Sequence, residues 1–203
     1  MKKAFLSICI VLSFTCCNST DYESLIKKSN SYKWYNNKKD AETALKYTDK
    51  AINKEPNIWN AYSLEINIYS VWVHFPPDFS DNFEGIKSVY DRWLSNGNKL
   101  NTLQKLGYAN TLYCLDDTLN ANQFYSEIIN YYNDNQIDFS ENERDYFIYI
   151  FAHLMLYDVD ENYFNKIKFS VYDDNKINDY LLDEINAIKE SGKKQLAERY
   201  CTS

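Results

Sequence analysis

Two adjacent cysteines, Cys16 and Cys17, are the residues whose type and spacing point most directly to chemistry. They follow an apolar run and precede Asn18. A disulfide between neighbouring cysteines would close a strained ring, and a zinc site would need further cysteines or histidines close by. The two histidines, His74 and His153, lie far along the chain. The cysteine pair is therefore expected to be a terminal anchor and not a bridge or a metal site.

The remaining reactive side chains do not form a recognisable catalytic set. His153 lies on the apolar stripe of a predicted helix, which favours a core position, and His74 is expected to act at a helix C-terminus. The acidic pairs Asp116-Asp117 and Asp173-Asp174 fall at predicted helix junctions, where caps and solvated turns explain them. The sequence lacks a Gly-rich phosphate loop, a His-Glu-x-x-His pattern and a Gly-x-Ser-x-Gly pattern. We therefore predict no enzymatic activity, no metal site and no cofactor.

The first sixteen residues have the layout of a secretory signal. Lys2 and Lys3 precede an apolar run over 4–14 that is too short to span a bilayer comfortably as a helix. Removing residues 1–16 takes away two lysines and no acids, so the net charge falls from -7 to -9. A chain this acidic repels phosphate backbones, and its Lys and Arg residues are scattered, so we predict no nucleic-acid partner.

The segment "LSFTCC", residues 12–17, resembles the lipobox of bacterial lipoproteins, in which a cysteine after the apolar run becomes the acylated first residue of the mature chain. The resemblance implies lipidation of Cys17, with Cys16 as the alternative; neither choice meets the full pattern of a Leu three residues before and a small residue directly before. Asn18, where Asp would favour the inner membrane, implies outer-membrane localisation. The membrane would be contacted only through this anchor. A cleaved signal and a soluble exported protein is the alternative.

Export would place the remaining cysteines in an oxidising compartment. Cys114 and Cys201 are then available for a disulfide, and their spacing does not decide whether it forms.

From residue 21 onward, apolar residues recur at the spacing of an α-helix. One stripe comprises Ala121, Phe124, Tyr125, Ile128, Ile129 and Tyr132. Only four glycines and three prolines are present, which argues against a many-stranded β protein. Asn96-Gly97 predicts a helix end with glycine in the left-handed region, and Ser140 with Glu143 predicts a capping box. We predict an all-α fold of about nine helices, near 21–36, 39–54, 57–75, 81–96, 99–115, 118–134, 141–157, 160–171 and 176–200.

The stretch "YNNKKDAETALKYTDKAINKEPN" carries Tyr35, Ala44, Ala51 and Pro56 at the spacing of the tetratricopeptide repeat, which it resembles. It departs from the repeat in lacking the Leu-Gly pair of the first helix and in carrying Thr48 where Phe is usual. The resemblance implies a right-handed superhelix of antiparallel helix pairs, and an unrelated helical bundle is the alternative. The implied organisation is a signal peptide at 1–16, an anchor and tether at 17–24, and a repeat domain at 25–203, with the best repeat at 25–58, degenerate repeats at 59–135, and paired helices with a C-terminal capping helix at 136–200.

Stacked helical hairpins present a ligand-binding surface lined by the first helices of the pairs. The resemblance carries that role to polar, amide-rich positions suited to an extended peptide: Lys33, Asn37, Asn60, Ser63, Asn67, Gln104, Tyr108 and Thr111. The predicted function is thus a lipid-anchored, non-catalytic module that binds a protein or peptide partner in the bacterial envelope.

Two alternatives stay open. One is a lipoprotein that captures a glycan or nutrient through the aromatic residues Trp59, Tyr62, Trp72, Phe79 and Trp93, although we expect most of these to wedge helices together. The other is an immunity-type lipoprotein that neutralises a toxin, with which the small size, acidity and anchoring are compatible.

Overall fold

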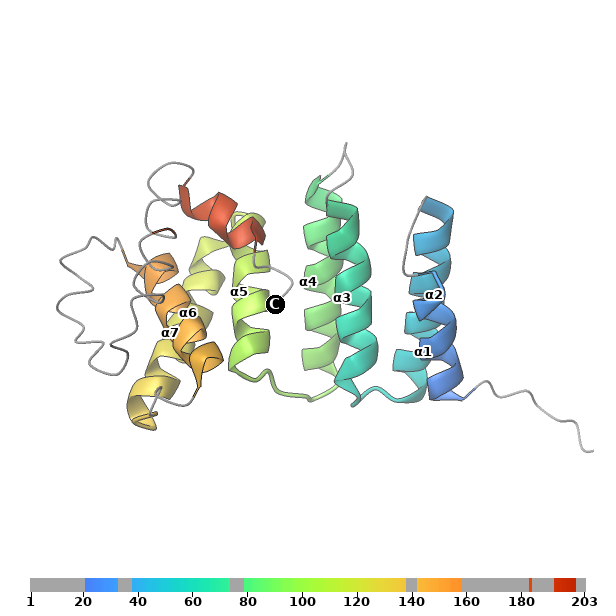
Figure 1. The fold of residues 1–203 in the computed structure, drawn as a ribbon, viewed down its shortest axis with the longest axis horizontal. Coiled ribbons are helices and arrows are strands. Elements are labelled where there is room, and N and C mark those ends of the chain that lie inside the picture. Colours follow the sequence, from blue (N-terminus) through green and yellow to red (C-terminus); the bar gives the residue numbers. More distant parts are fainter. Residues whose placement is uncertain are drawn as a thin grey trace, which may run out of the picture.

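The described part of the chain is a row of α-helices. The computed structural model describes residues 21–32, 38–73, 79–137, 142–157, 183 and 192–199, and these residues contain no strand. Seven helices stand side by side from α1 to α7 (Figure 1). They are α1 (Tyr22–Asn30), α2 (Lys38–Lys54), α3 (Trp59–Val73), α4 (Phe79–Ser95), α5 (Thr102–Cys114), α6 (Thr118–Asp134) and α7 (Glu143–Leu156). A further helical segment spans residues 192–199.

The all-α prediction is confirmed, and each of the first seven predicted segments contains a helix. The first helix ends at Asn30, six residues earlier than predicted. The segment expected at 160–171 lies outside the described residues, as does most of the segment expected at 176–200. The anchor residues Cys16 and Cys17 also lie outside them.

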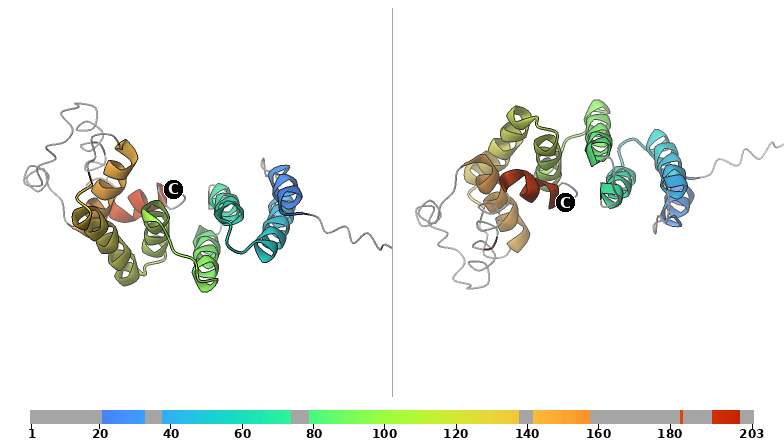
Figure 2. Two further views of the ribbon diagram at one scale, coloured as in Figure 1. Left: turned by 90° about the horizontal axis from the view of Figure 1, so that it is seen from below. Right: turned by 90° about the horizontal axis from the view of Figure 1, so that it is seen from above.

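Helices adjacent in sequence pack as hairpins: α1 with α2, α3 with α4, and α5 with α6, while α7 packs on α6. The short connection at 115–117 reverses the chain within the α5–α6 hairpin. The connections at 55–58 and 96–101 link each hairpin to the next one. Figure 2 shows α1, α3 and α7 on one side of the row and α2, α4 and α6 on the other. We call the side that carries α1, α3 and α7 the first-helix face.

Local sequence explains where several helices begin and end. Gly97 follows α4 with a φ of 79°, so the predicted left-handed glycine is confirmed. Asn101 and Gln104 form a capping box at the start of α5, each side chain accepting a backbone N–H at 2.9 Å. Asn142 caps α7, so the capping box predicted at Ser140 is wrong. The Asn142 side chain accepts an N–H of the first turn there, which places the start of the helix two residues later.

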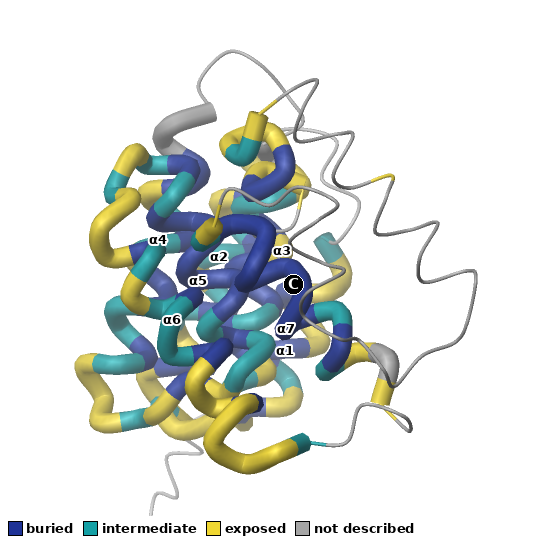
Figure 3. The backbone as a smooth tube through the Cα atoms, turned by 90° about the vertical axis from the view of Figure 1, so that its left-hand side faces the viewer, coloured by how far each residue is buried: buried dark blue, intermediate teal, exposed yellow. Residues whose placement is uncertain are grey.

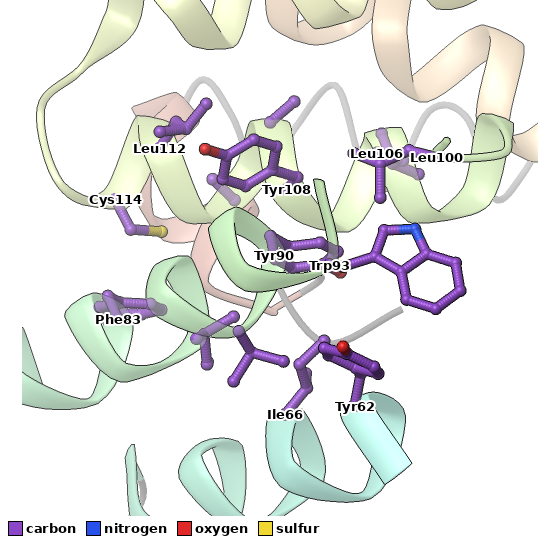
Figure 4. Close-up of a cluster of buried hydrophobic side chains, with 14 of the residues drawn as sticks. Tyr62, Ile66, Phe83, Tyr90, Trp93, Leu100, Leu106, Tyr108, Leu112 and Cys114 are labelled. Atoms are coloured by element: carbon purple, nitrogen blue, oxygen red, sulfur yellow. The ribbon is translucent and has the colours of Figure 1, made fainter. Parts of the chain in front are cut away.

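The core follows the surfaces on which the helices meet. Figure 3 shows buried positions along these contact surfaces and exposed positions along the outer sides. Ala41, Ala44 and Ala61 are fully buried, and such small residues let helices approach closely. Figure 4 shows the cluster that joins α3, α4 and α5, in which Tyr90 and Trp93 contribute rings from α4.

A group of hydrogen bonds, here called the knot, ties two turns together at one end of the helices, in the middle of the row. The Pro56 carbonyl, in the turn between α2 and α3, accepts a bond from the Tyr62 hydroxyl at 3.0 Å and one from the Asn98 amide at 3.1 Å. Asn96 donates to the Tyr62 hydroxyl at 2.8 Å. The turn after α4 is thereby fixed to the turn before α3.

Candidate interaction surface

Three of the predicted partner-binding residues form one stripe along α3. Asn60, Ser63 and Asn67 follow the three- and four-residue spacing of a helix face. Asn60 and Asn67 are exposed and Ser63 is half-buried. We call these three residues the α3 polar stripe. Lys33 and Asn37, the predicted sites before α2, lie outside the described residues.

The three sites predicted on α5 lie inside the protein. Gln104 is buried and completes the capping box with Asn101. Thr111 is fully buried, and its hydroxyl donates to the Gly107 carbonyl at 2.8 Å. Tyr108 is 7% exposed. The six described sites therefore divide into three on α3, of which two are exposed and one is half-buried, and three on α5 that are all buried.

Tyr108 fastens α5 to its neighbours. Its hydroxyl donates to the carboxylate of Asp91 on α4. Its ring lies 5.0 Å from that of Tyr90 and 5.1 Å from that of Phe124. Burial, together with the Asp91 carboxylate, raises the pKa of the Tyr108 phenol well above its usual range. The phenol therefore stays protonated and acts as a structural donor.

A pocket of about 330 Å³ lies at the seam between α4 and the α5–α6 hairpin. Its lining consists of Lys87, Leu94, Tyr108, Leu112, Asp117, Asn120, Gln123 and Phe124. The charged groups of this lining are already engaged within the protein. Lys87 pairs with Asp91 at 2.7 Å, and Asp117 accepts the Asn120 amide at 2.9 Å.

Behind the α3 polar stripe, Arg92 joins three helices. Its guanidinium donates to Asp49 of α2 at 2.7 Å and to Glu65 of α3, and it lies 5.7 Å from the centre of the Tyr62 ring. Glu65 is 4% exposed. Burial raises the pKa of Glu65 to about 7, and the positive charge of Arg92 partly opposes this rise. The network holds α3 in place between α2 and α4.

Local sequence patterns did not reveal this network. Arg92 is 43 residues from Asp49 and 27 from Glu65, so no helical spacing links the three side chains. A buried acid on the apolar side of α3 was the one available signal, because an acid in such a position requires a cation.

The aromatic residues of α3 and α4 pack against one another, as predicted for most of them. The Trp59 ring lies 5.0 Å from Trp93, and the Tyr62 ring lies 5.1 Å from Trp93 in an edge-to-face arrangement. Tyr62 and Trp93 are buried. The side chains of Trp72 and Phe79 lie outside the described part of the chain.

His153 is a core residue, as predicted. It is 6% exposed, and its ring lies 4.6 Å from Tyr149 and 5.5 Å from Tyr157. Burial lowers its pKa to about 4. Cys114 is also buried, while His74 and Cys201 lie outside the described residues, so the question of a Cys114–Cys201 disulfide stays open. No group of three or more His, Cys, Asp or Glu side chains within the described ranges is placed to hold a metal ion.

Comparison of the chain with protein-family models, with curated proteins and with solved structures finds no match. None of the helices in the described part of the chain combines the length and apolar character needed to cross a bilayer. The function is therefore inferred from the geometry of the side chains.

Proposed function

We propose that this protein is a lipid-anchored, non-catalytic module that binds a protein or peptide partner in the bacterial envelope. Its helix pairs would form a right-handed, tetratricopeptide-like superhelix of about nine helices, tethered to the outer membrane through Cys17 or Cys16. The observation that carries the proposal is the α3 polar stripe, in which the amides of Asn60 and Asn67 are exposed and Ser63 is half-buried.

The α3 polar stripe suits a peptide backbone because of its chemistry and its spacing. An asparagine amide offers two donors and an acceptor, so it can pair with both the N–H and the C=O of a peptide group. Asn60 and Asn67 are two helical turns apart, about 10 Å, which an extended peptide covers in about three residues. The Arg92 network behind α3 holds the helix in place, which limits the ordering cost of binding.

Without residues 1–16 the net charge of the chain is -9, which favours a basic partner through long-range attraction. Trp59, Tyr62 and Trp93 pack against one another, so they do not form a surface on which a sugar could stack. This argues against the alternative of a glycan-capturing lipoprotein. A toxin would also be a protein partner. Identifying the bound protein therefore distinguishes the immunity-type alternative from the proposed function.

The test is site-specific photo-crosslinking in intact envelopes. A photoreactive amino acid is placed singly at Asn60, Ser63 and Asn67, and the captured protein is identified by mass spectrometry. We expect the same protein to be captured from all three positions in a stoichiometric complex.

Asn53 on α2 and Asn130 on α6 are matched controls, because both are exposed helical asparagines outside the stripe. The proposal fails if the stripe and control positions capture the same mixture, or if Asn60→Ala with Asn67→Ala leaves the yield of the complex unchanged.

A further inference from the structure

The pocket between α4 and the α5–α6 hairpin combines buried apolar side chains with an exposed polar edge. Tyr108 and Leu112 of α5, both labelled in Figure 4, are buried, and Phe124 of α6 is half-buried. Asn120 and Gln123 are exposed. The volume of about 330 Å³ lies at the lower end of the range of ligand pockets, about 300–1,000 Å³. Figure 2 shows α4 and α6 on the side of the row opposite the first-helix face, so the pocket is separate from the α3 polar stripe.

The charges around this pocket are unbalanced in favour of acids. Lys87 of α4 pairs with Asp91 at 2.7 Å, and Glu84 lies one turn before Lys87 on the same side of that helix. Asp117 lines the pocket together with Lys87. The hydrogen bond to Asp91 raises the pKa of Lys87, burial opposes this rise, and the charges of all three carboxylates add to it. Three carboxylates thus act on one ammonium, and the group of four has a net charge of -2.

Asp117 is held in place by neutral donors. Its carboxylate accepts the Asn120 side-chain amide at 2.9 Å and 3.1 Å and caps the start of α6. The N-terminal end of a helix carries about half a positive charge, so it compensates only part of the carboxylate. A fixed carboxylate beside an apolar pocket favours a ligand with an apolar stem and a cationic end.

The aromatic side chains of the pocket favour a guanidinium over an ammonium. The ring centres of Tyr108 and Phe124 are 5.1 Å apart, with their planes inclined at 56°. The Tyr108 hydroxyl donates to Asp91, which fixes its ring. A guanidinium is planar and weakly hydrated, stacks on aromatic rings and binds a carboxylate through two donors, whereas an ammonium is strongly hydrated.

An exposed leucine beside the pocket favours a polypeptide as the source of the cation. Leu119 is 81% exposed, and it lies four residues before Gln123 on the same side of α6. A polypeptide that places one side chain in the pocket can also cover this leucine, whereas a small free cation cannot.

We propose that this pocket binds the side chain of an arginine presented by a partner protein. The guanidinium contacts Asp117 and the rings of Tyr108 and Phe124, and its stem lies against Leu112. The same partner covers Leu119. That the arginine belongs to a protein rests on the proposed function, whereas the preference of the pocket for a guanidinium does not.

An NMR titration of the full-length chain tests the preference for a guanidinium. The probe is N-acetylarginine methylamide, and N-acetylcitrulline methylamide is the neutral control of the same shape. We expect saturable binding of the arginine probe with a dissociation constant of about millimolar, followed by the amide shifts of the pocket residues. The citrulline probe should bind about tenfold more weakly, because its hydrogen bonds lack the positive charge. Equal binding of the two probes, or shifts that spread over the acidic surface without saturating, would overturn the proposal.

Two substitutions should move the affinity in opposite directions. Asp117→Asn removes the charge and keeps a side chain that caps a helix, so it should weaken binding of the arginine probe about tenfold. Lys87→Gln removes the competing ammonium and should strengthen binding about threefold. Asp134→Asn is the matched control, since it removes the same charge at the exposed far end of α6 and should leave the affinity unchanged.

The proposal is overturned if a folded Asp117→Asn chain binds the arginine probe as the wild type does, or if Asp134→Asn weakens binding equally. If Asp117→Asn does not fold, Lys87→Gln decides, because an affinity that fails to rise contradicts an acid-dominated pocket.

Photo-crosslinking from Leu119 in intact envelopes tests the source of the arginine. We expect a protein adduct whose crosslinked segment contains an arginine, and its loss in the Asp117→Asn chain. An adduct that persists in that chain, or no protein adduct at all, would overturn a protein occupant. If the α3 polar stripe captures nothing while the titration succeeds, the proposed function fails and the guanidinium site stands.

Discussion

Helix α3 carries the exposed residues Asn60 and Asn67, whereas α5 is buried along most of its length. Both helices are first members of hairpins and have the same relation to their partners. The difference lies in their neighbours, because α5 packs against α4, α6 and α7, whereas α3 packs against α2 and α4. Two helices with the same place in a hairpin can thus differ in burial according to the elements that surround them.

The α2–α4 region and helix α7 also differ in the buried titratable group that each contains. The α2–α4 region contains Glu65, whose pKa is raised to about 7, and α7 contains His153, whose pKa is lowered to about 4. Burial disfavours the charged form in both cases. The contribution of Glu65 to stability is therefore lost as the pH rises, and that of His153 is lost as the pH falls. Measuring stability against pH thus distinguishes the two regions.

Arg92→Met should produce the largest effect. It leaves the buried Glu65 without its cation, and breaking a buried pair in this way costs about 3–5 kcal/mol. Urea denaturation at pH 8 measures the loss. The double variant Glu65→Gln with Arg92→Met should recover most of it. A loss below about 1 kcal/mol for the single variant would show that the network does not hold α3.

Glu65→Gln should change the pH dependence by an intermediate amount. The folded pKa of Glu65 lies above its ordinary value of 4.5, so the folded state binds this proton more tightly than the unfolded state does. The contribution of Glu65 is fully present below about pH 4.5 and is lost as the pH rises through about 7. Between pH 5 and pH 8 the wild type should therefore lose about 2–3 kcal/mol that the variant keeps, as measured by urea midpoints.

His153→Phe should change the pH dependence of stability in the opposite direction to Glu65→Gln. The folded pKa of His153 lies below its ordinary value of 6.5, so its contribution is present above that pH and is lost as the pH falls towards 4. The phenylalanine variant should resist acid better than the wild type. Parallel pH profiles for the wild type and both variants would contradict the assignment of these two groups.

Gln104→Ala should produce the smallest effect and act on stability alone. It removes half of the capping box at the start of α5, at a cost of about 0.5–1 kcal/mol. Thermal unfolding measures the loss, and Gln123→Ala on the exposed side of α6 is the matched control. Loss of the crosslinked partner with unchanged stability would instead give Gln104 a direct binding role.

Helical periodicity predicted the all-α fold and the position of α3, whereas Asn60 and Asn67 were singled out by the resemblance to the tetratricopeptide repeat. Periodicity did not predict the interior position of Thr111, because α5 packs against α4 and α7 as well as against its hairpin partner α6. The Lys194–Asp116 pair joins positions 78 residues apart, and no local pattern reports such a contact. The Arg92 network was missed for the same reason. Periodicity shows which side of a helix is apolar, and tertiary contacts decide what covers it.

The knot at Pro56 bears on how the row can bend. The Tyr62 hydroxyl and the Asn98 amide both donate to one carbonyl, so the turns before α3 and after α4 are joined at that end of the molecule. The hydrogen bonds at Pro56 therefore join the two connections that link the second hairpin to α2 and to α5, and relative motion of α2 and α5 at this end of the helices must stretch or break them.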